Sequence, residues 1–91
     1  MANEQRILRF KGNVQGVGFR YTACRTADRY DVGGYVRNEP DGSVECVVEG
    51  QADEIREFVN DLTDRMSRYI RETQQQTAPY SGRYAGFNVK Y

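Results

Sequence analysis

The chain has 91 residues, a length that suits one compact domain with a thin core and is too short for two. Its 13 basic residues balance its 13 acidic residues, so the total charge does not favour a polyanionic partner such as DNA or an acidic membrane surface. No apolar run approaches the ~20 residues needed to span a bilayer, and the first residues lack the layout of a secretory signal. We therefore predict a single cytoplasmic domain over residues 1–91 that acts as a monomer.

The first third of the chain predicts a strand followed by a helix. In "RILRFKG", Leu8 and Phe10 alternate with neighbours of the opposite face, which is the period of a strand with one buried face, from about Arg6 to Gly12. After the segment "GNVQGVGFRY", a helix is predicted by apolar residues that recur at helical spacing, namely Phe19, Ala23, Ala27 and Tyr30.

The middle of the chain predicts a hairpin and a second helix. "DVGGYVRNEPDGSVECVVEG" reads as two strands joined by a turn at residues 39–42, where Pro40 presets the backbone and Gly42 closes the turn. The second helix is predicted from about Gln51 to Asp64 by an apolar stripe of Ile55, Phe58, Val59 and Leu62.

The last third is the least regular. Residues 66–86 predict an exposed edge strand followed by a loop, and "GFNVKY" predicts a short final strand with Phe87 and Val89 on one face. The order of elements predicts an α+β fold, the ferredoxin-like α/β sandwich (βαββαβ), with an antiparallel sheet and two helices on one face. We place Tyr30 and Tyr35 between the first helix and this sheet. The fold by itself leaves the function open.

The chain contains no histidine and only two cysteines, which limits the chemistry available to it. Neither a zinc site nor a Cys-His nucleophile can be assembled from these residues. We interpret Cys24 and Cys46 as small apolar core residues, and a disulfide between them stays open because each could face the same core. Neither a metal nor a cofactor is expected.

The segment "GNVQGVGFRY" has the composition of a phosphate-binding loop. Its glycines tolerate positive φ, so successive N–H groups can turn inward, and the helix that follows adds its free amides and the positive end of its dipole. Arg20 adds a planar fork of donors that suits phosphate oxygens. The same glycines also suit a plain tight connection, and neither a P-loop nor a G-x-G-x-x-G motif is present. The candidate amide donors are those of Gln15, Gly16, Val17, Gly18, Phe19 and Arg20.

Two stretches of the chain resemble the signatures of a known family. "GNVQGVGFR" and "GGYVRNEPDGSVECVVEG" are similar to the two signature motifs of the acylphosphatases, in the same order and at the same separation, so the resemblance covers about Arg6 to Leu62. The chain departs from the family pattern in having Asp31 where a glycine is usual and Tyr35 where tryptophan is common. It also has "TDRMSRYIRETQQQT" where the family commonly has a Gly-Pro pair and a more regular strand.

This resemblance implies an enzyme that hydrolyses the carboxyl-phosphate bond of acyl phosphates to a carboxylate and inorganic phosphate. It implies that Arg20 binds the phosphate, that Asn38 orients the attacking water, and that the amides of residues 15–20 surround the phosphoryl oxygens without a metal. Since no histidine is available as a base, we interpret a phosphate oxygen of the substrate as the acceptor of the water's proton.

Three other functions compete with this one. The loop would also suit a phosphate-binding module that has lost catalysis, and an acylphosphatase-like domain occurs at the front of larger carbamoyl-transfer maturation proteins. RNA-recognition modules share the predicted fold. However, "GVGFRY" precedes a helix here and the net charge is zero, so we expect no nucleic-acid partner. On local sequence alone, Asn38 is also typical of an asparagine that simply flanks a turn.

Overall fold

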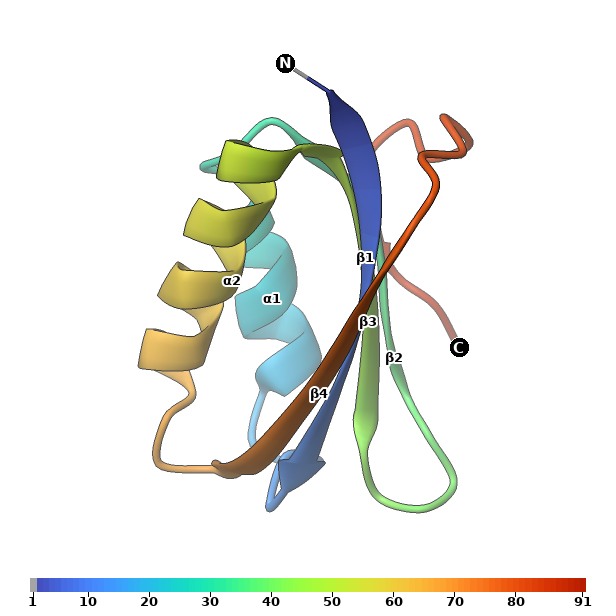
Figure 1. The fold of residues 1–91 in the computed structure, drawn as a ribbon. Helices are drawn as coiled ribbons and strands as arrows, with labels where there is room; N and C mark the ends of the chain where they lie inside the picture. Colours follow the sequence, from blue (N-terminus) through green and yellow to red (C-terminus); the bar gives the residue numbers. More distant parts are fainter. Residues whose placement is uncertain (1) are drawn as a thin grey trace.

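The computed structural model describes residues 2–91. Two helices lie side by side on one face of a sheet, and the other face of the sheet carries no helix (Figure 1). In chain order the elements are β1 (Asn3–Gly12), α1 (Phe19–Ala27), β2 (Val32–Asn38), β3 (Val44–Gln51), α2 (Ala52–Arg65), β4 (Ile70–Ala78) and β5 (Phe87–Val89).

The sheet has the strand order β4-β1-β3-β2-β5. The β4-β1, β1-β3 and β3-β2 pairs are antiparallel, as predicted for a ferredoxin-like fold. β5 is parallel to β2, with Gly34 opposite Phe87, so the sheet is mixed rather than wholly antiparallel. The Gln-rich segment is strand β4 at one edge, which confirms the prediction of an edge strand followed by a loop.

The core lies between the sheet and the two helices. Leu8 and Phe10 of β1 are fully buried, and so are Ile55 and Phe58 of α2, which confirms both apolar patterns. The Phe10 and Phe19 rings lie 5.1 Å apart between centroids and so join the start of α1 to the sheet. The contact fixes the position of the loop between β1 and α1, because that loop connects these two residues.

The element bounds differ from the predicted ones where polar residues hide the pattern. β1 begins at Asn3, three residues before the predicted start, because the polar Asn3, Glu4 and Gln5 pair with the end of β3 without showing any alternation. α1 ends at Ala27, so Tyr30 lies beyond the helix, where its ring packs edge-on against Phe58 of α2.

The predicted place of Tyr35 is wrong. Its neighbour Val36 is fully buried in the core, and because successive strand side chains point to opposite faces, Tyr35 lies on the face without helices. There its hydroxyl donates to Glu45 Oε1 and its ring packs against Tyr84. The sequence pattern missed this because the partner of Tyr35 on that face, Tyr84, comes from the distant loop after β4.

The two cysteines are free, which answers the question of a disulfide. Cys46 is fully buried in β3, as predicted. Cys24 packs against the core with one side only and is half-buried.

A buried carboxylate holds the segment between β4 and β5. Glu49 is only 4% exposed, and it accepts hydrogen bonds from the backbone N–H of Ser81 at 2.7 Å and of Gly82 at 3.1 Å. Gln5 Nε2 donates to the same carboxylate at 2.7 Å. Burial raises the pKa of Glu49, but the hydrogen bonds from Ser81, Gln5 and Gly82 outweigh it and hold the pKa below its usual value.

We predict that Glu49→Gln lowers the free energy of unfolding by about 1–3 kcal/mol, because an amide accepts these hydrogen bonds less well than a carboxylate. A carboxyl whose pKa is lowered by folding stabilises the protein above its unfolded-state pKa and loses this contribution as the pH falls through the folded-state pKa. The difference between the variant and the parent should therefore shrink below the unfolded-state value of 4.5. Urea unfolding at several pH values in the acid range measures this difference in the free energy of unfolding. Glu57→Gln, at an exposed position, is the control.

Candidate active site

The loop between β1 and α1 adopts the conformation that its glycines permit. Gly16 and Gly18 both have φ of +78°, in the left-handed region that other residues rarely occupy. Gly18 is also the N-cap of α1, and no side chain caps that end of the helix. The first intrahelical bond runs from the Thr22 N–H to the Gly18 carbonyl, so the amides before Thr22 precede the helical ladder.

The loop amides find no acceptor in the part of the chain that the structure describes. Across residues 2–91, none of the backbone N–H groups of residues 15–20 donates a hydrogen bond. A group of free donors beside the positive end of a helix dipole attracts an anion. This arrangement suits the predicted phosphate-binding loop.

Two contacts hold the loop in place. The Asn13 N–H donates to the carbonyl of Tyr69, just before β4. The Gln15 side chain donates from Nε2 to the carbonyls of Glu39 at 2.8 Å and Ser43 at 2.9 Å. Gln15 therefore ties the loop to the turn between β2 and β3, next to the end of β2 where Asn38 lies. The sequence pattern suggested Gln15 only as an amide donor and missed this role of its side chain.

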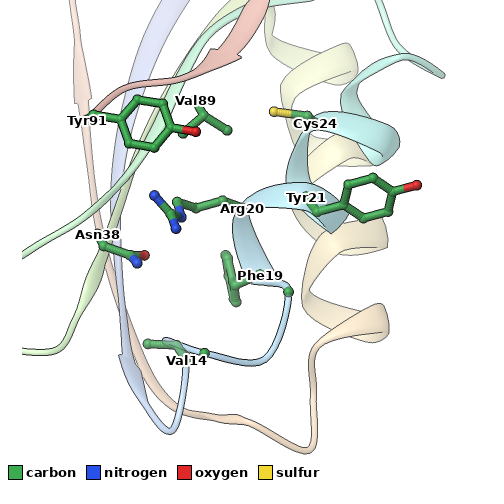
Figure 2. Close-up of a pocket in the computed structure, with 10 residues that line it drawn as sticks. Val14, Phe19, Arg20, Tyr21, Cys24, Asn38, Val89 and Tyr91 are labelled. Carbon is green, nitrogen blue, oxygen red and sulfur yellow. The ribbon is translucent and has the colours of Figure 1, made fainter.

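Arg20 and Asn38 line the same pocket, whose volume is about 380 Å³. Figure 2 shows both side chains directed into it, Arg20 from the first turn of α1 and Asn38 from the end of β2. Gly16, Gly18 and Val14 line the pocket on the side of the loop. The fold thus brings together the arginine, the asparagine and part of the glycine loop, which are separated in the sequence.

The charge in this pocket comes from Arg20. Within residues 2–91 no Asp or Glu lines the pocket, and no carboxylate forms an ion pair with Arg20. The guanidinium lies instead over the ring of Tyr91, 5.4 Å from its centroid. By contrast, Arg37 next to Asn38 pairs with Glu39 and Glu45. Arg20 is therefore the cation of the pocket that remains available to an anion.

Asn38 has an unmatched acceptor. Its Oδ1 is buried and accepts no hydrogen bond from any residue in the range 2–91. Leaving a buried acceptor unpaired costs about 1–3 kcal/mol, so a donor placed against Oδ1 would be bound favourably. This distinguishes Asn38 from a plain turn-flanking asparagine, whose side chain would bond to the turn itself.

The other side of the pocket is apolar, and of its residues only Phe19 was predicted as part of the site, for its backbone amide. Cys24 of α1, Val89 of β5 and Tyr91 line it together with Phe19 and Tyr21. Burial, followed by the nearby charge of Asp28, raises the pKa of the Cys24 thiol, which keeps it protonated and weakly nucleophilic at neutral pH. Sequence reasoning missed Val89 and Tyr91 because β5 reaches the site through its parallel pairing with β2, which the alternation of Phe87 and Val89 does not reveal.

The described residues show neither a metal-binding cluster nor a membrane-spanning helix. Across residues 2–91, His, Cys, Asp and Glu side chains do not gather in a group of three or more that would suit a metal ion. Neither helix in that range has the length and apolar character required to cross a membrane.

Comparison with known proteins shows the family of the chain. The family model described as Acylphosphatase matches residues 6–89. An acylphosphatase of Aeropyrum pernix is 41% identical over 88 residues, which are 94% of this chain and 86% of that protein. The crystal structure of acylphosphatase from Bacillus subtilis is similar with a TM-score of 0.85 at 27% identity, covering 99% of this chain and 100% of the other. The T.kodakarensis HypF structure is 30% identical with a TM-score of 0.78, covering 99% of this chain but 12% of its own.

We predict that Gln15→Ala loosens the loop without removing any pocket group. The loss of two hydrogen bonds should lower the free energy of unfolding by about 1–2 kcal/mol, although the carbonyls of Glu39 and Ser43 keep their backbone donors, the N–H groups of Gly42 and Glu39. The inhibition constant of inorganic phosphate should rise because the amides no longer hold one arrangement. Urea unfolding and phosphate titration measure the two effects, and Gln75→Ala on the exposed edge strand is the control. A Gln15 variant that binds phosphate as tightly as the parent would contradict the role of the tether.

Proposed function

Because the chain belongs to the acylphosphatase family and hydrolyses acyl phosphates to a carboxylate and inorganic phosphate, we propose that Arg20, Asn38 and the amides of residues 15–20 carry out this reaction. The observation that supports the assignment is the shared pocket, in which an unpaired guanidinium, a buried unpaired amide oxygen and a loop of free amides meet.

Arg20 and the loop bind the phosphoryl group. The planar guanidinium donates to two phosphate oxygens, and the amides of Gln15 to Arg20 donate to the others. These donors are oriented before the substrate arrives, since Gln15 and the Phe10–Phe19 contact fix the loop. Donors placed in advance stabilise the charge that develops on the phosphoryl oxygens without reorganising during the reaction.

Asn38 orients the nucleophile. Its Oδ1 accepts a hydrogen bond from a water molecule, which turns a lone pair of the water toward phosphorus. The water oxygen forms a bond to phosphorus as the bond between phosphorus and the acyl oxygen breaks, and the carboxylate leaves with the electron pair. A phosphate oxygen of the substrate takes the water's proton. The mixed anhydride is already activated, so positioning and charge stabilisation provide most of the catalysis.

We also infer that the protein works as a monomer in the cytoplasm. The pocket is lined by residues of one chain, so no second copy is needed to complete it. Both cysteines are free, as is usual in a reducing compartment.

Arg20→Lys should lower kcat/KM for a simple acyl phosphate by about 10²- to 10³-fold, because an ammonium group cannot reproduce the planar pair of donors. Benzoyl phosphate hydrolysis measures the loss, and inorganic phosphate should compete with the substrate in the parent but only weakly in the variant. Arg29→Lys is the matched control, because Arg29 is exposed and lies just after the end of α1. This variant should keep the parent rate. Parent activity in Arg20→Lys would refute the assignment of Arg20.

Asn38→Ala should lower kcat while leaving the inhibition constant of inorganic phosphate close to that of the parent, because Asn38 holds the water and not the phosphate. Steady-state kinetics with benzoyl phosphate and phosphate as competitor separate the two effects. The exposed Asn60→Ala on α2 should behave like the parent. Binding of the substrate without hydrolysis by the parent protein would instead favour a phosphate-binding module.

A further inference from the structure

The pocket contains more space than a phosphoryl group needs. Its volume of about 380 Å³ lies within the range of pockets that hold small organic ligands, and its polar groups are not spread evenly around it. Figure 2 shows the loop at one end, Arg20 and Asn38 in the middle, and Val89, Cys24 and the ring of Tyr91 beyond the guanidinium. The pocket thus has a phosphate end and an apolar end.

The apolar end is fixed by the fold on two sides. Cys24 follows Arg20 by one helical turn and therefore shares its face of α1. Val89 belongs to β5 and lies opposite Val36 of β2. Both Cys24 and Val89 are half-buried and pack against the core, so they form rigid walls.

Tyr91 leaves a large apolar surface beside these walls. Its ring lies over the Arg20 guanidinium, 5.4 Å from the centroid, and its side chain is 95% exposed. The other exposed tyrosine of the pocket, Tyr21, directs its ring away from Arg20 (Figure 2). An apolar group attached to a phosphate held by Arg20 would therefore cover the free surface of Tyr91 and lose contact with water.

The charges of the pocket exclude some acyl groups. Arg20 is its only basic residue within the described range, and the proposed function commits this residue to the phosphate. A second carboxylate on the acyl group would meet no other basic side chain, and an ammonium group would meet no acidic side chain, because no Asp or Glu of residues 2–91 lines the pocket. The raised pKa of Cys24 leaves that wall neutral as well.

We propose that Cys24, Val89 and Tyr91 form a subsite for the acyl group, which selects acyl phosphates whose acyl group is uncharged and apolar, with Tyr91 as the residue that determines this specificity. The proposal rests on the proposed function, since it takes the phosphate to be bound by Arg20 and the loop. It extends that function from the reaction to the class of substrate.

The test compares kcat/KM for benzoyl phosphate with kcat/KM for acetyl phosphate. Tyr91→Ala should lower the benzoyl-to-acetyl ratio by about threefold to tenfold, the range expected for losing one aromatic pair. Tyr91→Phe should keep the ratio, because the ring remains. The control is Tyr80→Ala, which removes an exposed tyrosine away from this pocket and should also keep the ratio. Any effect of Tyr91 on phosphate binding through Arg20 acts on both substrates and cancels in the ratio.

A second comparison uses two acyl groups of equal length in the parent protein. Butyryl phosphate should have a higher kcat/KM than succinyl phosphate, whose additional carboxylate finds no partner in the pocket. An unchanged ratio in Tyr91→Ala, or succinyl phosphate turned over as well as butyryl phosphate, would overturn the proposal. Failure of the proposed function looks different, since Arg20→Lys would then keep its activity on every substrate.

Discussion

The structure depends on a loop whose backbone donors stay free. In the loop between β1 and α1, the backbone N–H groups of residues 15–20 find no acceptor among residues 2–91, whereas most backbone groups of a folded protein are paired within it. Gly16 and Gly18 reach this state through left-handed conformations, and α1 begins without a side-chain cap. The glycines permit this conformation, and contacts with the surrounding elements hold the loop in it.

Two segments that are distant in the sequence and one neighbouring strand provide this support. Gln15 ties the loop to the turn between β2 and β3, Asn13 ties it to the chain before β4, and Phe19 packs on Phe10 at its exit. The first of these contacts matters most for the proposed chemistry. It holds the loop against the end of β2, where Asn38 lies, and so fixes the free amides relative to the asparagine that we propose as the water-binding residue.

The final part of the chain completes the pocket from the other side. Glu49 holds the loop after β4 by accepting hydrogen bonds from the backbone N–H groups of Ser81 and Gly82. After this loop, β5 runs parallel to β2 toward the site. Val89 and Tyr91 reach the pocket through this path. A buried carboxylate at one end of β3 thus helps to place the apolar end of a pocket whose polar end is formed by the β1–α1 loop. In the proposed reaction, the polar end of the pocket binds the phosphate and orients the water. The apolar end is then available to the acyl group.

The sequence by itself determined the order of elements, the apolar faces of β1 and α2, and the position of the glycine loop before α1, because each depends on local periodicity or on glycine. It also indicated Arg20 and Asn38, through the resemblance of two stretches to the signature motifs of the family. Only the tertiary structure decided that Tyr35 lies on the face without helices, that β5 is parallel to β2, and that Gln15 acts through its side chain. Each of these rests on a contact between segments far apart in the chain, and neither propensity nor spacing carries information about which distant segment will be the partner.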